Sequence, residues 1–122
     1  MTSLSISDAA AQAGVSAHTL RYYERAGLLD AVAREGSGHR RFGEADLARV
    51  EFVSRLRATG MPIRDVRRYV DLVRAGDDTE PERLALLVEH RERVRAHLAE
   101  VRRSLERIDA KIDLYRERTR SR

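Results

Sequence analysis

Arg21, near the N-terminus, carries a guanidinium group that could bind an anion or the edge of a nucleic-acid base. It follows Leu20, which helical spacing assigns to the core, so its guanidinium group is expected to point away from the core. An arginine placed in this way can hydrogen-bond to a guanine edge or to a phosphate. The alternative is a surface ion pair with Glu24 or Glu51.

The residues just before Arg21 would form the start of the same helix. Ser16 is suited to cap this helix, which is the simpler interpretation, and it can also touch a phosphate at the helix N-terminus. Ala17 and His18 occupy the first turn, where the base contacts of a recognition helix usually arise. For His18, a role facing DNA and simple exposure to solvent are both open.

Residues 5–27 supply a helix-turn-helix that would hold these side chains. Apolar residues at helical spacing predict a first helix, with Ser5 or Ser7 as its N-cap. Gly14 suits the left-handed backbone position that ends a helix, and a second helix is expected from residue 17 to about residue 25. Two helices joined by a short turn that contains Gly are typical of the helix-turn-helix motif.

Residues 30–42 are expected to form a short two-stranded wing. The glycine-rich stretch 35–38 is of the kind that reverses a β-hairpin. Arg40 and Arg41 lie near the base of this hairpin. Because neighbouring residues of a strand point to opposite faces, at most one of these two arginines faces DNA squarely.

Two further helices, over residues 44–59 and 62–75, are expected to complete a DNA-binding domain of residues 1–76. Each carries apolar residues at helical spacing, and Pro62 suits the first turn of the second helix, where its missing N–H costs nothing. Arg64 follows in the same turn, so it is a candidate for a phosphate contact from a second wing.

After this domain we expect a polar linker at 77–81, one long coiled-coil helix at 82–118 and a polar tail at 119–122. Apolar residues of the long helix recur in steps of three and four, which is the heptad pattern of a coiled coil. A domain of this size is too small to cover so long a seam, so a second copy of the chain is the expected partner. Arg91 favours a register that lets its head reach solvent or a carboxylate. The seam consists of Leu84, Leu87, Arg91, Val94, Leu98, Val101, Leu105, Ile108, Ile112 and Tyr115.

Composition limits other kinds of chemistry. The 122 residues are 36% charged and 5% aromatic, and the net charge of +4 permits an anionic partner without locating its binding face. The absence of cysteine excludes disulfides, thiolate metal sites and thiol redox sensing. No enzyme activity and no cofactor are expected. With neither a secretory signal nor a membrane-length apolar run, the expected location is the cytosol.

No metal site is expected from the histidines of the long helix. His90 and His97 are seven residues apart, which places them about 10.5 Å apart along a helix. One tetrahedral metal needs ligand bonds of about 2 Å, so a single helix cannot chelate it with this pair. A contact across a dimer is the alternative, but solvated flanks of the coiled coil are the simpler interpretation.

Several stretches together resemble the signature of MerR-family transcription regulators. They follow one another in the family's order over nearly the whole chain, and their combination is far more specific than any one of them. The stretches are AGVS at 13–16, TLRYYE at 19–24, GLL at 27–29, GHRRF at 38–42 and TGMPI at 59–63.

The resemblance implies a mainly α fold, in which a winged helix-turn-helix DNA-binding domain precedes a long dimerisation helix in an antiparallel coiled coil. It implies a homodimer on a pseudo-palindrome in a promoter spacer, which bends and untwists double-stranded DNA and so acts indirectly on RNA polymerase. It also adds Thr19, Tyr22, Tyr23 and His39 to the DNA-binding residues. Tyr22 and Tyr23 cannot share a helix face, so one is expected in the core and the other at a phosphate.

The resemblance leaves the signal open. Only seven residues follow Tyr115, too few for a ligand-binding domain. The junction and helix sequences, including Thr79, Arg83 and His90, most resemble the branch of the family that responds to aldehydes or other electrophiles. Members of that branch often carry a cysteine near the position of Arg55, and this chain lacks it. Either an unidentified small apolar ligand binds between helical layers, or there is no effector. An architectural or adaptor protein, which bends DNA without controlling transcription, is the alternative function.

Overall fold

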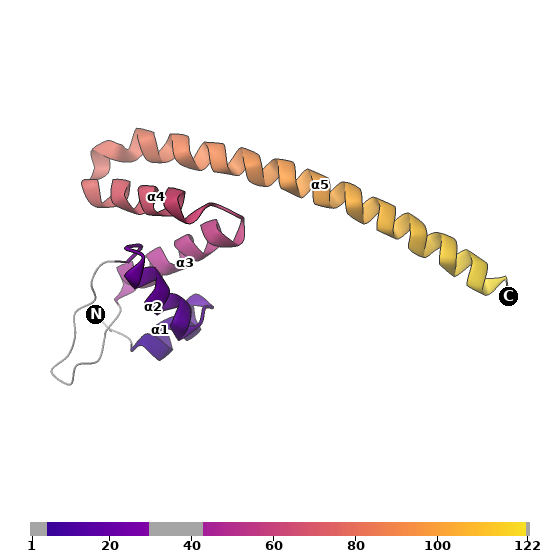
Figure 1. The fold of residues 1–122 in the computed structure, drawn as a ribbon, viewed down its shortest axis with the longest axis horizontal. Coiled ribbons are helices and arrows are strands. Elements are labelled where there is room, and N and C mark those ends of the chain that lie inside the picture. The colour runs from indigo at the N-terminus through magenta and orange to yellow at the C-terminus, as the bar shows by residue number, and fades with distance from the viewer. Residues whose placement is uncertain (1–4, 30–42, 122) are drawn as a thin grey trace. The chain divides into compact units, whose positions relative to one another are not determined.

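The computed structural model describes residues 5–29 and 43–121, and every regular element in them is helical. The expected wing at 30–42, with His39, Arg40 and Arg41, lies outside the described residues. The mainly α fold predicted from the sequence is confirmed. The elements are α1 (Ile6–Ala13), α2 (Ala17–Arg25), α3 (Glu44–Ala58), α4 (Ile63–Ala75), the short 3₁₀ helix η1 (Asp77–Thr79) and α5 (Glu80–Arg120) (Figure 1).

Side-chain caps define the two helices of the helix-turn-helix. The Ser5 hydroxyl accepts a hydrogen bond from the Asp8 N–H at 3.3 Å, so Ser5 and not Ser7 caps α1. Gly14 ends α1 at a φ of 72°, in the left-handed region. The Ser16 hydroxyl caps α2 by accepting from the Thr19 N–H at 3.0 Å. These caps satisfy backbone donors that a helix start leaves without partners.

The core of the first unit, residues 1–84, lies among α1, α2, α3 and α4. Helix α1 contacts α2 and α3, and α3 contacts α4. On α4 the fully buried positions are Val66 and Val70, whereas Tyr69 is half-buried against Phe52 of α3, with ring centroids 5.4 Å apart. The largest fully buried side chains of this core are Leu20, Leu28, Val50, Val53, Met61, Val66 and Val70.

Hydrogen bonds to main-chain oxygens fix the corner between α3 and α4. The Arg57 guanidinium donates to the Met61 carbonyl at 2.7 Å. The Thr59 hydroxyl is within hydrogen-bond distance of the carbonyls of Arg55 and Leu56, at 2.9 and 3.1 Å. Pro62 stands just before α4 as its N-cap residue, one position earlier than expected. The corner therefore holds the start of α4 in a defined place.

The segment 77–81 is not a simple polar linker. Residues 77–79 form η1, and α5 begins at Glu80, so Pro81 lies in its first turn, where a proline costs no helical hydrogen bond. The Thr79 hydroxyl is within hydrogen-bond distance of the Leu72 and Gly76 carbonyls, at 2.6 and 2.8 Å. Arg83 donates to the Thr79 hydroxyl at 3.0 Å and to the Gly76 carbonyl at 3.1 Å. These contacts bind the end of α4 to the start of α5.

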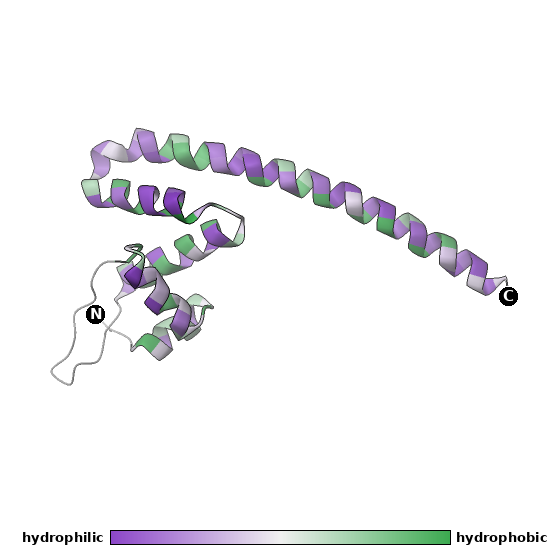
Figure 2. Cartoon of the chain, in the orientation of Figure 1, coloured by the Kyte–Doolittle hydropathy of each residue, from purple (hydrophilic) through white to green (hydrophobic). Residues whose placement is uncertain are grey.

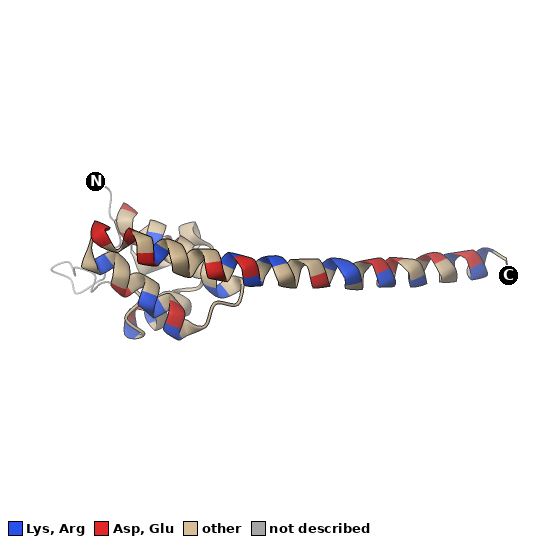
Figure 3. Cartoon of the chain, turned by 90° about the horizontal axis from the view of Figure 1, so that it is seen from above, with Lys and Arg blue, Asp and Glu red and all other residues tan. Residues whose placement is uncertain are grey.

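Helix α5 has 41 residues, which corresponds to a length of about 62 Å. It begins two residues before the expected position and ends two residues after it. Its apolar residues recur along the helix between hydrophilic ones (Figure 2), and acidic and basic residues alternate along its surface (Figure 3). None of the helices within the described residues is long and apolar enough to span a membrane.

Candidate DNA interface and dimerisation seam

One face of α2 presents three of the expected DNA-binding side chains to solvent. His18, Arg21 and Tyr22 are all exposed. Within the described residues, no ion pair joins Arg21 to Glu24 or Glu51, the two alternatives considered for it. The guanidinium group of Arg21 is therefore available to a ligand.

The start of α2 is shaped by its cap. Besides accepting from the Thr19 N–H, the Ser16 hydroxyl lies 3.0 Å from the Thr19 hydroxyl. The simpler interpretation of Ser16, a helix cap, is therefore the one the structure contains. Ala17 and Thr19 are half-buried, so their side chains contribute less to an outer surface than His18 does.

The two adjacent tyrosines of α2 have different environments. Tyr23 is buried, with 6% of its surface exposed, and its hydroxyl lies 3.4 Å from the Oγ of Ser54 on α3. Tyr22 is 42% exposed, and its ring is tilted against that of Tyr23 with centroids 6.1 Å apart. The prediction that one tyrosine packs in the core is correct, and the structure identifies it as Tyr23.

Basic residues that the sequence reasoning did not single out lie beside this face. Arg25 is exposed one helical turn after Arg21, and this spacing was the available signal. Arg74 of α4 donates to the carbonyl of Gly27 at 2.9 Å, which ties α4 to the chain just after α2. The exposed Arg67 of α4 lies against the same glycine, with guanidinium atoms 3.7 Å from where a Cβ would stand.

Arg64, the expected phosphate contact after Pro62, lies on the surface. Its side chain is 86% exposed, and its Nε is 3.9 Å from the nearest carboxylate oxygen of Asp65. It lines a shallow groove of α4 together with Arg67, Arg68, Asp71 and Leu72. Three arginines in one groove favour an anionic ligand over a neutral one.

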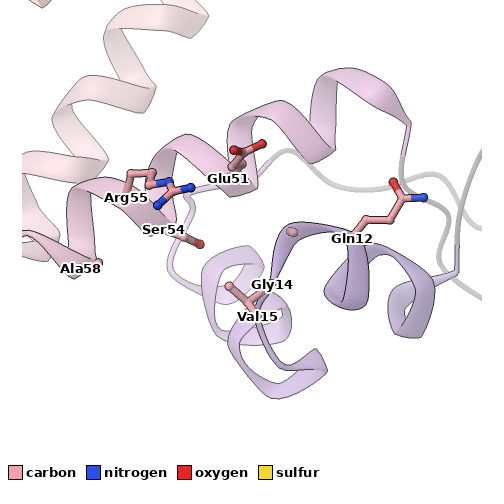
Figure 4. A pocket seen from close by; sticks show the side chains of 8 residues that line it. Gln12, Gly14, Val15, Glu51, Ser54, Arg55 and Ala58 are labelled. Carbon is pink, nitrogen blue, oxygen red and sulfur yellow. The ribbon is translucent and has the colours of Figure 1, made fainter.

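A separate open pocket of about 430 Å³ lies between the α1–α2 turn and α3 (Figure 4). Its lining includes Gln12, Val15, Ser54 and two charged residues, Glu51 and Arg55. This mixture of charged and small side chains does not favour the small apolar ligand considered from the sequence. The described residues contain no group of three His, Cys, Asp or Glu side chains that could hold a metal ion.

The apolar seam of α5 divides into two parts. Leu87 and Val94 are half-buried within the single chain, which their heptad positions did not predict. The other seam residues are exposed, and apolar side chains as open as Leu84, at 63%, and Ile108, at 55%, are unusual in a row. The exposed members are Leu84, Arg91, Leu98, Val101, Leu105, Ile108, Ile112 and Tyr115.

Comparison with known proteins identifies the family. The family model described as MerR HTH family regulatory protein matches residues 4–72. The chain belongs to the MerR family. A second model, described as MerR, DNA binding, matches residues 47–111, so the two MerR models together extend from the helix-turn-helix into α5.

Individual MerR-type relatives agree with this assignment. An HTH-type transcriptional regulator of Haemophilus influenzae is 38% identical over 107 residues, which cover 88% of this chain and 79% of that protein. The regulator AdhR of Bacillus subtilis is 38% identical over 91 residues, which cover 75% of this chain and 65% of that protein. The chain is therefore a DNA-binding transcription regulator of the MerR type.

Solved structures of MerR regulators share the fold. The crystal structure of HiNmlR, a MerR family regulator lacking the sensor domain and bound to promoter DNA, matches with a TM-score of 0.85 at 35% identity. The match covers 95% of this chain and 92% of that one. A putative MerR regulator of Listeria monocytogenes matches with a TM-score of 0.84 at 38% identity, covering 92% and 85% of the two chains.

Proposed function

We propose that this MerR-type regulator binds a pseudo-palindromic promoter spacer as a homodimer and controls transcription by bending and untwisting the DNA. The observation that carries the proposal is the exposed face of α2, on which His18, Arg21 and Tyr22 are open while Tyr23 holds the helix to α3. A rigid helix with an exposed cationic face suits insertion into the major groove. The protein would act where the chromosome is, in the bacterial cytosol.

Individual residues divide between base and phosphate contacts in this proposal. Arg21 and His18 reach base edges or phosphates in the groove, and the Tyr22 hydroxyl reaches a phosphate. Ser16, Ala17, Thr19 and Tyr23 act mainly by placing these groups. Arg64 contacts the flanking backbone, and His39, Arg40 and Arg41 do so from the wing. An arginine in the groove supplies specificity, whereas the backbone contacts set affinity and its dependence on salt.

The exposed seam of α5 supports the proposed homodimer. A row of apolar side chains along a helix of about 62 Å is stabilised when a second helix covers it. Two copies of the DNA-binding unit would then match the two-fold symmetry of a pseudo-palindrome. RNA polymerase would respond to the altered DNA geometry rather than to a direct contact. Because the energy lies in deforming DNA, no catalytic residue is required.

Binding to the palindrome upstream of the protein's own gene tests the proposal. In a gel-shift experiment at about 0.15 M salt, which screens weak non-specific contacts, we expect a specific complex that a scrambled duplex of equal length does not form. No complex with any promoter-spacer palindrome would exclude the proposed function. Circular-permutation gels should show bending, and transcription with RNA polymerase in vitro should change when the protein is added. Bending without a change in transcription would instead support the architectural role.

A further inference from the structure

Asp109 occupies an unusual position beside the seam of α5. Among the residues that flank the seam it alone is acidic; these residues are Val88, His90, Arg95, His97, Arg102, Ser104, Asp109, Lys111, Arg116 and Arg118. Within one helix a carboxylate pairs with cations three or four residues away. At these distances Asp109 meets two apolar residues and two acidic ones, Glu106 and Asp113. Among the described residues it makes no ion pair, so a cation that pairs with it would come from outside its own helix.

Arg91 is the only charged residue of the seam itself. Within the chain its Nε lies 3.3 Å from Glu92 Oε1, and the same oxygen lies 3.3 Å from Nη1 of Arg95. One carboxylate oxygen therefore serves two guanidinium groups. When a partner helix covers the seam, Arg91 becomes partly buried among apolar side chains. A second carboxylate would stabilise its charge there.

A parallel, in-register dimer gives neither residue a partner. It would place Arg91 opposite the partner's Arg91 in the seam, and Lys111 beside the partner's Arg116. Asp109 would face Ser104, which carries no charge. Like charges facing each other across a covered seam are strongly unfavourable, so this orientation conflicts with the charge pattern.

An antiparallel dimer in which all ten seam positions overlap separates the two copies of Arg91, and separates Lys111 from the partner's Arg116. In this register Leu84 lies opposite the partner's Tyr115, Val94 opposite the partner's Leu105, and Leu98 opposite the partner's Val101. Arg91 then lies opposite the partner's Ile108, directly beside the partner's Asp109. By two-fold symmetry the contact occurs twice, once near each end of the coiled coil.

We propose that Arg91 of each subunit binds Asp109 of the other, and that these two ion pairs set the register of the antiparallel dimer. The inference rests on the proposed homodimer and specifies its geometry. Register matters for function because it sets the separation of the two DNA-binding units. The same register brings Arg95 near the partner's Arg102, and Glu92, 3.3 Å from Arg95, offsets this repulsion.

A register shifted by one heptad is the closest competitor. One such shift would pair Asp109 with the partner's Arg95 and place Arg91 against the partner's Tyr115. It would, however, leave Leu84 of each subunit, which is 63% exposed in the single chain, without an apolar partner, because its opposite position falls beyond Tyr115. The lost burial of apolar surface favours the full overlap.

Disulfide cross-linking tests the register, and the chain suits it because it contains no cysteine. Val94→Cys and Leu105→Cys are made as separate variants. In the proposed register residue 94 faces residue 105 of the partner, while two copies of residue 94 are offset by 11 residues, or about 16 Å. Disulfides bridge Cα atoms less than about 7 Å apart. We expect no cross-link in either variant alone, and a cross-linked heterodimer when both are refolded together and oxidised.

Two results would overturn the register. A cross-link in either variant alone would indicate a parallel dimer. A cross-link between Val94→Cys and Ile112→Cys subunits, but not between Val94→Cys and Leu105→Cys subunits, would indicate the shifted register. Sedimentation of the unaltered protein separates these failures from failure of the homodimer itself. A monomer at micromolar concentration would contradict the proposed function, whereas a dimer with other cross-links would contradict only the inference.

Charge removal tests the ion pair. Asp109→Asn should weaken dimerisation about tenfold, since two partly covered pairs are lost together. Asp113→Asn removes the same charge from the same helix away from the seam, and it should change the dimer dissociation constant less than about twofold. In an Arg91→Met background Asp109→Asn should have no further effect. Equal losses for both aspartates, or the same loss without Arg91, would show that Asp109 has no specific partner.

Discussion

The hydroxyl of Tyr23 lies 3.4 Å from the Oγ of Ser54, a contact that joins α2 to α3 across 31 residues of sequence. It separates the two adjacent tyrosines by role, since Tyr23 is buried and Tyr22 is exposed. Helix α2, with its nine residues, is thus joined to α3 on its inner side while its outer face stays open.

Exchanging each tyrosine for phenylalanine separates anchoring from DNA contact. Tyr23→Phe removes the contact with Ser54, and because that hydrogen bond is long we expect a loss of about 0.5 kcal/mol in the free energy of unfolding. Tyr22→Phe should leave stability unchanged and weaken DNA binding. Urea unfolding followed by circular dichroism measures the first effect, and fluorescence anisotropy with labelled DNA the second. Equal effects of the two variants on both measurements would contradict the assignment.

The cap of α2 supports a prediction about stability. Ser16→Ala removes the hydroxyl that accepts from the Thr19 N–H at 3.0 Å. The free energy of unfolding should fall by about 1 kcal/mol, and Ser16→Asp should retain most of it because aspartate is also a good cap. Thermal unfolding of both variants measures this. If Ser16→Ala and Ser16→Asp lowered the free energy of unfolding equally, helix capping would not explain the stabilising effect of Ser16.

Gly14 permits a test of backbone strain alone. Its φ of 72° is left-handed, and a Cβ built there meets no atom within 4 Å. Gly14→Ala should therefore cost about 1–2 kcal/mol of folding free energy through conformation and not through a clash. Gly14→Asn should cost less, because asparagine tolerates this conformation better. If unfolding curves showed Gly14→Asn to be less stable than Gly14→Ala, this explanation would be wrong.

The hydrogen bonds of Thr79 predict that the α4–α5 junction depends on its hydroxyl. Thr79→Val keeps the shape but removes the contacts with the Leu72 and Gly76 carbonyls and the acceptor for Arg83. We expect a loss of about 1–3 kcal/mol in the free energy of unfolding, and recovery of most of it in Thr79→Ser. Hydrogen exchange at the end of α4 should increase in the valine variant. Unchanged exchange there would contradict a junction fixed by this hydroxyl.

Local patterns predicted the helices well. The spacing of apolar residues, the glycine after α1 and the serine before α2 indicated the helix-turn-helix, and the heptad steps indicated a single long helix. In these cases the determinant lies within a few residues of the feature. The mainly α fold could therefore be predicted from the sequence, with boundaries shifted by one or two residues.

Other features depend on residues far away in the sequence. The contact of the Tyr23 hydroxyl with Ser54 joins two helices across 31 residues of sequence, and the half-burial of Leu87 and Val94 was not indicated by their heptad positions. The segment 77–81 is rich in residues typical of loops, yet the hydroxyl of Thr79 and the fit of Pro81 in a first turn make it helical. Long-range contacts of this kind leave no periodic signal in the sequence.

The affinity of an Arg21→Ala variant for the operator tests the central claim most directly. Arg103→Ala, which removes the same charge from an exposed position of α5, is the matched control. We predict that Arg21→Ala weakens specific binding about 5- to 150-fold, equivalent to about 1–3 kcal/mol. It should also reduce the ratio of the affinity for operator DNA to the affinity for scrambled DNA. Arg103→Ala should leave this ratio of affinities unchanged. Full operator affinity and full specificity in Arg21→Ala would contradict the placement of the DNA interface on α2.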